Sequence, residues 1–318
     1  MKVWRYGLEE GPPRSGPTVL TLGNFDGVHA GHRELVEAAV RSAGARGLPA
    51  AVVTFDPHPS LVVAPEHKPK LLTTQAQRLA VFEAAGVDIT WVIPFSRPFS
   101  QLSAQNFLVG LDRVLEPVEL HVGRAFRFGR DRLGDLLALE TWGLDTGCKV
   151  IPHAFKAHDE GWLSSTRVRE ALEWGEVEEA ARLLGHPYVL TGVVVEGDRR
   201  GRHLGFPTAN LQWEQEQLPA SGVYATEVRG SHLGHPRLGL TNVGLKPTFQ
   251  GLSLSVETFL PDFTGDLYGA RLELAFLHRI RGEQRFEGVE ALREQIAHDV
   301  EAGVAWWKVQ RLKAEGKS

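Results

Sequence analysis

Short apolar runs alternate with amphipathic stretches over the first half of the chain. Residues 18–22, 50–55, 88–95 and 118–123 are apolar and rich in β-branched side chains, a composition typical of buried parallel strands. Residues 33–41, 75–85 and 104–115 carry apolar side chains at helical spacing. Strands that alternate with helices in this way predict an α/β fold with a parallel sheet wound in the Rossmann manner.

The pattern changes after residue 188 to short β-rich segments separated by glycines, at 189–196, 222–228, 238–243, 253–260 and 270–277. This pattern predicts an antiparallel barrel. A terminal helix over about 288–313, with Leu292, Ile296 and Val300 at helical spacing, is expected to cover it. Because the preceding helical region stops at Gly185, we expect two domains, 1–185 and 186–318.

Composition narrows the class of protein. The 318 residues suffice for two cores, and 42% hydrophobic with 23% charged residues is ordinary for a soluble globular protein. A net charge of −4 argues against nucleic-acid binding, and no segment reads as a signal peptide or membrane span. The single cysteine, Cys148, fits a reducing compartment. We expect a cytoplasmic protein without nucleic-acid or membrane partners; a weak homo-oligomer stays open.

Gly23 to His32 lies between the first strand and the first helix of this pattern. His29 and His32 are three residues apart and therefore share one face of a first helical turn. Glycines allow close approach of the backbone to a ligand, and a helix N-terminus offers free N–H groups to an anion. These features suit a polyphosphate; a metal site, or two polar residues at a helix start, are the alternatives.

Three other stretches of this half carry candidate chemistry. Asp56 and His58 follow the second strand, where open α/β sheets bind ligands, although both also suit a turn. Residues 123–135 contain four arginines within nine residues, interleaved with aromatics and glycines. That composition suits a site for phosphate and a flat ring, or else a solvated loop. Ser165 or Thr166 is expected to cap the helix that contains Arg169.

In the second half, residues 196–211 combine glycines with a basic cluster and suit phosphate. Thr208 and Asn210 are two apart in an extended segment, so their side chains point the same way. Hydroxyl and amide oxygens are hard ligands that suit Mg²⁺; a turn rich in Gly, Pro and Asn is the alternative. Glu257 lies mid-strand among apolar residues, either as a structural hydrogen-bonding group or as a general base.

The motifs resemble those of one family. GNFDGVHAGH (23–32) resembles the GxFDGxHxGH signature of nucleotidyltransferases that use ATP, and FDPHP (55–59), VGRAFRFG (122–129) and SSTRVR (164–169) extend the likeness. GRHLGFPTANL (201–211) resembles the riboflavin kinase signature, supported by NVGLKPTF (242–249), SVETFL (255–260), DLYG (266–269) and RGEQRF (281–286). Over nearly its whole length the chain resembles the bacterial bifunctional FAD synthetases, which are riboflavin kinases and FMN adenylyltransferases.

The resemblance implies an N-terminal nucleotidyltransferase domain, a C-terminal riboflavin kinase barrel, and ATP as co-substrate with FMN and FAD as substrate and product. It implies that Thr208 and Asn210 hold Mg²⁺ with ATP, and that Glu257 activates the riboflavin 5′-hydroxyl. His29 and His32 would bind the triphosphate, and Arg169 its β- and γ-phosphates. Further implied ATP or phosphate contacts are Gly23, Asn24, Phe25, Asp26, Gly31, Ser164, Ser165, Thr166, Gly197, Gly201 and Gly205. Implied flavin contacts are Asp56, His58, Phe126, Arg127, Phe128 and Arg285.

Two positions depart from the family pattern. Ala125 stands where the family has Asp or Asn, and Phe259 replaces a usual His. The change at Ala125 leaves open a riboflavin kinase whose adenylyltransferase activity is weak or lost. A non-catalytic flavin-binding regulator is the other alternative, and the presence of His29, His32 and Glu257 argues against it.

Overall fold

A computed structural model describes residues 1–9, 14–154, 163–197, 201, 204–248 and 251–315. Side chains are described within these ranges except at 246–248, 251–252 and 314–315. The chain divides into two compact units, Met1–Ser165 and Thr166–Ser318. The functional boundary expected at residue 185 stays a prediction.

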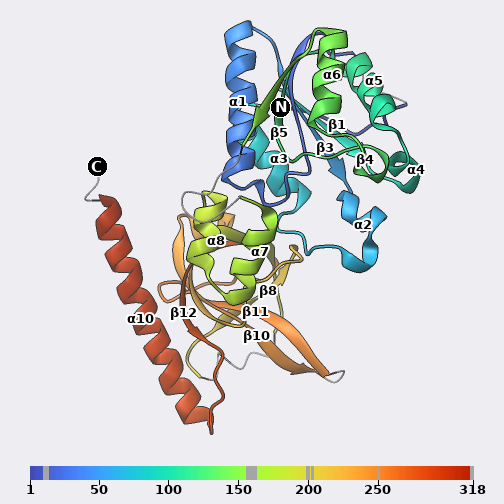
Figure 1. The fold of residues 1–318 in the computed structure, drawn as a ribbon. Helices are drawn as coiled ribbons and strands as arrows, with labels where there is room; N and C mark the ends of the chain where they lie inside the picture. Colours follow the sequence, from blue (N-terminus) through green and yellow to red (C-terminus); the bar gives the residue numbers. More distant parts are fainter. Residues whose placement is uncertain (10–13, 155–162, 198–200, 202–203, 249–250, 316–318) are drawn as a thin grey trace. The chain divides into compact units, whose positions relative to one another are not determined.

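The first unit is a parallel sheet with helices on its faces (Figure 1). Its strands lie in the order β1-β4-β3-β2-β5-β6, and every neighbouring pair is parallel. The strands are β1 (Lys2–Trp4), β2 (Thr18–Leu22), β3 (Ala50–Asp56), β4 (Ile89–Pro94), β5 (Pro117–Gly123) and β6 (Lys149–His153). The helices are α1 (Ala30–Arg46), α2 (Pro59–Val63), α3 (Gln75–Ala84), α4 (Arg97–Ser100), α5 (Ala104–Leu115) and α6 (Leu136–Thr146). The predicted α/β class is confirmed.

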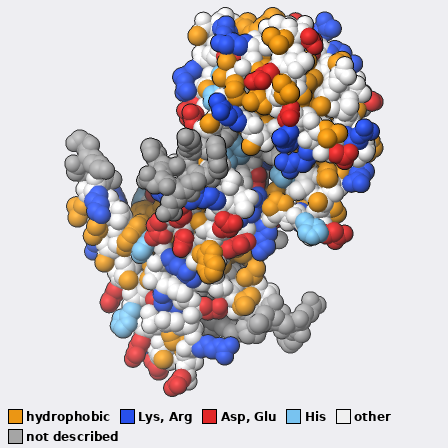
Figure 2. Space-filling model, in the orientation of Figure 1, with side chains coloured by type: hydrophobic (Ala, Val, Ile, Leu, Met, Phe, Trp, Pro, Cys, Tyr) orange, Lys and Arg blue, Asp and Glu red, His pale blue; other side chains and the backbone are white. Residues whose placement is uncertain are grey.

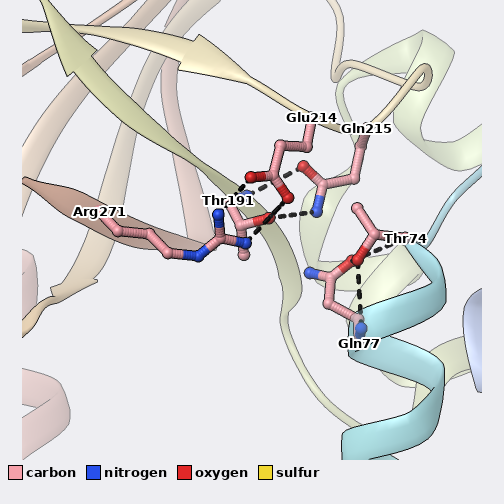
Figure 3. Close-up of polar contacts among 6 residues, drawn as sticks. All are labelled: Thr74, Gln77, Thr191, Glu214, Gln215 and Arg271. Carbon is pink, nitrogen blue, oxygen red and sulfur yellow. Dashed lines mark hydrogen bonds and ion pairs between the residues drawn. The ribbon is translucent and has the colours of Figure 1, made fainter. Parts of the chain in front are cut away.

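The central strands form because they are apolar on both faces. All five residues of β2 are buried, and the core beside them includes Trp91 of β4 and Leu111 of α5. Side chains fix where helices begin: Thr74 and Gln77 form a capping box at the start of α3 (Figure 3). Because all six strands run parallel, their carboxyl ends lie at the same edge of the sheet, and the loops that leave this edge carry the candidate site.

The second unit begins with α7 (Ser165–Trp174, whose first residue belongs to the first unit) and α8 (Val177–Leu184), followed by a closed barrel. Its described strands lie in the order β10-β11-β8-β7-β12-β9, and neighbouring strands are antiparallel. They are β7 (Tyr188–Val195), β8 (Thr208–Trp213), β9 (Gly222–Arg229), β10 (Arg237–Thr248), β11 (Gly251–Phe259) and β12 (Arg271–Gly282). The predicted barrel and terminal helix, α10 (Val289–Glu315), are confirmed.

Polar pairs tie the strands of the barrel to neighbouring segments. The Arg281 guanidinium of β12 donates to the buried Asp299 carboxylate of α10, with Nη2 2.8 Å from Oδ2, which ties the long helix to the barrel. Directly after β8, Glu214 pairs with Arg271 of β12, and the side chain of Gln215 bonds Thr191 of β7 (Figure 3). All three pairs link residues at least 18 positions apart in the sequence, so they contribute only once these segments have come together.

Some local predictions were wrong or incomplete. α7 begins at Ser165, so Ser165 and Thr166 lie in its first turn rather than at its N-cap, and the Ser165 hydroxyl instead donates to the Asp26 carbonyl at 2.8 Å. The helical region up to Gly185 is interrupted at Gly175, whose φ of +74° ends α7. The sequence analysis did not predict β1, which is short, or β6, which is only partly buried. It also missed the helix α6.

Surface features are mixed. Acidic and basic side chains are interspersed over the coloured atoms of the face drawn in Figure 2. Within the described residues, no helix is long and apolar enough to cross a membrane. Cys148 is buried, and burial raises its thiol pKa to about 12, so the thiol stays protonated.

Candidate active sites

The stretch from Gly23 to Val28 leaves β2 through an unusual backbone. Phe25, Gly27 and Val28 have φ values of 53°, 80° and 39°, in the left-handed region that few side chains favour. Burial compensates for this strain: the Phe25 ring is fully buried, 5.3 Å from the Phe82 ring and 5.2 Å from the His32 ring. The turn delivers His29 to the N-cap of α1, and Gly31 is buried in the first turn.

The two histidines lie together, as their spacing predicted. Their rings stack with centroids 3.7 Å apart, and the His29 Nδ1 accepts a hydrogen bond from the His32 backbone N–H at 3.3 Å. That bond places the proton of neutral His29 on Nε2. Burial lowers the His29 pKa to about 4; burial and then the neighbouring His29 lower that of His32 well below 6.5. Both rings are therefore neutral hydrogen-bond donors at pH 7.

Asp26 faces inward and orders the loop. Its buried carboxylate accepts hydrogen bonds from the backbone N–H groups of Leu72, at 3.0 Å, and Thr73, at 3.2 Å. The Thr73 hydroxyl in turn accepts from the Gly27 N–H at 3.0 Å. This carboxylate thus holds the histidine loop against residues 72–73, and its expected contact with phosphate stays a prediction.

Arg78 of α3 contacts the histidine loop and was not singled out by the sequence analysis. It is buried beneath the loop, and its Nη1 donates to the Asn24 carbonyl at 3.0 Å. Burial lowers its pKa, while the charges of Asp26 and Asp56 raise it. The available signal was its place four residues before the buried Phe82, on the apolar face of a helix.

The expected flavin contacts of this unit lie at the ends of β3 and β5. Asp56 is exposed, and His58 is the N-cap of α2, where its Nδ1 accepts from the Ser60 N–H at 3.3 Å. Phe128 is buried in the core against Phe107, at a centroid distance of 5.7 Å, and stacks on Phe126.

The arginines of this loop serve different purposes. Arg127 pairs with Asp135, the N-cap of α6, at 2.9 Å, whereas Arg124 is exposed. The aromatic residues and Arg127 thus have structural partners, and their flavin roles stay predictions. Ala125, the departure from the family pattern, is exposed in the same loop.

The segment from Ser164 to Arg169 spans the division between the units. Ser164 and Ser165 belong to the first unit, where Ser165 holds the Asp26 carbonyl. Thr166 and Arg169 belong to the second; Thr166 is exposed and Arg169 half-buried. Their proposed phosphate contacts stay predictions.

In the second unit, strand pairing brings Thr208, Asn210 and Glu257 together. Glu257 of β11 is directly opposite Asn210 of β8, and Phe259 is opposite Thr208, so these side chains share one face. The Thr208 hydroxyl donates to Glu257 Oε2 at 3.1 Å. Because this hydroxyl donates a hydrogen bond to the carboxylate, the lone pairs of its oxygen stay available to a cation.

Glycines make room around these side chains. A Cβ at Gly197 would lie 2.2 Å from the Asn210 Nδ2, and one at Gly201 would lie 2.4 Å from the Phe206 carbonyl oxygen and 3.3 Å from the Thr208 hydroxyl. Gly205 has a φ of +88°, which glycine adopts without strain. Phe259, the second departure, packs edge-on against Phe206 at 5.5 Å. The expected flavin contact Arg285 is exposed after β12.

In comparisons with known proteins, two family models match successive parts of the chain. Residues 12–167 match the family model described as FAD synthetase, and residues 184–307 match the model described as riboflavin kinase. Residues 168–183, which contain Arg169 and most of α7 and α8, lie between the two matches.

Curated relatives match along most of their length. The bifunctional riboflavin kinase/FMN adenylyltransferase of Escherichia coli K12 is 40% identical over 289 residues, which is 90% of this chain and 91% of that protein. The protein of the same description from Bacillus subtilis 168 is 35% identical, over 91% of this chain and 92% of its own. A solved structure from Streptococcus pneumoniae, described as a macrolide-efflux protein, is 30% identical with a TM-score of 0.85, covering 96% of this chain and all of its own.

Proposed function

The chain belongs to the family of bifunctional riboflavin kinase/FMN adenylyltransferases, and on that premise we propose which of its side chains serve each reaction. It phosphorylates riboflavin with ATP to FMN and adenylylates FMN to FAD, with pyrophosphate as the second product. Two functional domains, 1–185 for adenylylation and 186–318 for phosphorylation, are part of the proposal.

For the kinase reaction, Glu257 is the general base that takes the proton of the riboflavin 5′-hydroxyl. The observation that supports this role is the meeting of Glu257 with Thr208 and Asn210 on adjacent strands. A carboxylate beside a hydroxyl and an amide oxygen places proton acceptor and phosphate-binding groups on one face. Gly197, Gly201 and Gly205 let the backbone approach the phosphates, and exposed Arg285 contacts the flavin.

The residues present fit Mg²⁺. The Thr208 oxygen keeps lone pairs free, Asn210 supplies an amide oxygen, and a side chain at Gly197 would fill the space beside it. Such hard oxygen ligands are the kind that magnesium shares with phosphates and water. When bound, Mg²⁺ would screen the charge of the ATP phosphates; Thr208 and Asn210 would orient them toward the hydroxyl that Glu257 deprotonates.

For the adenylyl reaction, His29 and His32 bind the triphosphate of a second ATP while the FMN phosphate attacks the α-phosphorus. Neutral His29 carries its proton on Nε2, and the His32 Nδ1 is buried without a partner among the described residues. A bound anion raises the pKa of both rings, so their positive charge grows where negative charge accumulates. Ser164, Ser165, Thr166 and Arg169 would contact the phosphates, and no covalent intermediate is needed.

The remaining proposals concern the flavin and the setting of the enzyme. Asp56, His58, Phe126, Arg127 and Phe128 are proposed to border the FMN from the loops after β3 and β5. We place the protein in the cytoplasm, without nucleic-acid partners, and leave a weak homo-oligomer open.

The test is product analysis of matched variants. Wild type, Glu257→Gln and His29→Asn are each given ATP and Mg²⁺ with either riboflavin or FMN, and the flavins are separated by chromatography. Glu257→Gln should make FMN at least about a hundredfold more slowly, because it lacks the base, yet convert supplied FMN to FAD at the wild-type rate. His29→Asn should form FMN normally and little FAD. The reaction that each variant retains is its folding control. Loss of both reactions in either variant would contradict the assignment of the two reactions to separate sets of residues.

Ala125 tests the alternative of a weak adenylyltransferase. Ala125→Asn restores a polar side chain at an exposed loop position. If the missing contact limits this reaction, the variant should lower the KM for FMN about threefold to tenfold, as for one hydrogen bond, with kinase rates unchanged. An unchanged KM would mean that Ala125 does not limit adenylylation.

A further inference from the structure

A buried polar chain, separate from the residues assigned above, crosses the strands β5 and β6. Glu119 and His121 lie on β5, 4% and 5% exposed, and His153 is the last residue of β6. The His121 Nε2 is 2.9 Å from the Glu119 Oε1, and its Nδ1 is 2.9 Å from the His153 Nε2. Among the described residues, no group of His, Cys, Asp and Glu is arranged as a metal site.

The hydrogen bonds define which atom donates. Ser42 and Arg46 of α1 also donate to the Glu119 carboxylate. Although burial alone would raise the Glu119 pKa, these hydrogen bonds, that from His121 and the charge of Arg46 lower it, so Glu119 is ionised. An ionised carboxylate only accepts, so His121 donates from Nε2 and, when neutral, accepts at Nδ1. His153 must then donate from Nε2.

Other charges face this chain from α1. Burial lowers the His153 pKa, Glu34 opposes this shift and Arg41 adds to it; burial also lowers the His121 pKa. On the other side of β5, His121 is opposite Thr21 of β2, which carries no charge. The environment therefore favours two neutral histidines at pH 7, a state in which the hydrogen-bond directions are compatible.

The hydrogen-bonded series Glu119, His121 and His153 ends at the edge of the sheet where β5 gives way to the arginine-rich loop. His121 is two residues before Gly123, which ends β5, and Gly123 is opposite His153 in register. The Arg124 N–H donates to the His153 carbonyl at 2.9 Å, so the arginine-rich loop starts against His153.

We propose that His121 is a positioning residue for FMN adenylylation: lying beside Glu119, it accepts a hydrogen bond from His153 and thereby fixes where the arginine-rich loop leaves β5. The inference rests on the proposed adenylyl site at this edge of the sheet. A displaced arginine-rich loop would weaken FMN binding more than it slows the chemical step, because the histidines proposed to bind the triphosphate lie at the start of α1.

Two amide variants separate the two hydrogen bonds of His121. Asparagine places its Oδ1 on Cγ, as histidine places Nδ1, so His121→Asn keeps the acceptor for His153 and loses the donor to Glu119. Glutamine places its Nε2 at the reach of the histidine Nε2, so His121→Gln keeps the donor to Glu119 and loses the acceptor for His153. Both introduce one buried amide, which makes each the control for the other.

The measurement is steady-state adenylylation of FMN, with the riboflavin kinase rate of the same preparation as a folding control. We expect His121→Gln to raise the KM for FMN about fivefold to tenfold with kcat within about twofold, the effect of one lost hydrogen bond. His121→Asn should keep the KM for FMN within about twofold of wild type. Adding His153→Leu to this variant should raise the KM to that of His121→Gln, because the hydrogen-bond donor is then lost. Equal KM values for the Asn and Gln variants, with equal losses of thermal stability, would overturn the proposal. If His29→Asn also left adenylylation intact, the proposed site itself would be wrong.

Discussion

Acid should destabilise the first unit through His29. Its pKa is about 4 in the folded protein and 6.5 when unfolded, so between these values the unfolded state binds more protons. The stabilisation is therefore present above pH 6.5 and is lost as pH falls toward 4. With 1.36 kcal/mol per pKa unit, the full loss is about 3 kcal/mol, of which about 1.3 kcal/mol falls between pH 7.5 and 5.5.

The matched variant is His29→Asn, because Asn keeps a side-chain oxygen to cap α1 and does not titrate. Protein is equilibrated in urea at pH 7.5, 6.5 and 5.5 and then pulse-labelled with deuterium at one common pH. Mass spectrometry of peptides from residues 18–46 reports the unfolding of the first unit separately from the barrel.

We expect the free energy of unfolding of wild type to fall more steeply than that of His29→Asn, by about 1.3 kcal/mol over this range. His32 titrates in the same direction in both proteins, so it cancels in the difference to first order. Identical pH slopes for the two proteins, or wild type gaining stability on acidification, would refute a buried neutral His29.

Three further predictions test other contacts. Asp26→Asn should cost about 1–3 kcal/mol in urea unfolding of the first unit, because an amide replaces the carboxylate that accepts from two backbone N–H groups; a cost below about 0.5 would contradict this. Gly197→Ala should slow the kinase at least about tenfold, since its Cβ meets Asn210, while conversion of supplied FMN to FAD stays the control. Asp299→Asn should destabilise the barrel by about 3–5 kcal/mol by leaving the partly buried Arg281 without its anion; unchanged urea unfolding would show that this pair is not needed.

Local sequence determined the elements and the chemistry of the motifs. The buried strand 18–22, the glycine-rich turn and the two histidines at helical spacing could be assigned because each signal lies within about ten residues. The alternation of strands and helices and the later run of short strands likewise predicted both folds. These are properties of neighbouring residues, which chain periodicity reports directly.

Tertiary structure alone decided which distant side chains meet. Strand register brings Thr208 and Asn210 against Glu257, although 49 residues separate Thr208 from Glu257. Parallel pairing of β5 and β6 likewise joins His121 to His153, which no local pattern marked. A side chain's partner depends on which strands become neighbours and in what register, and that choice is made by burial over the whole sheet or barrel rather than by any one segment.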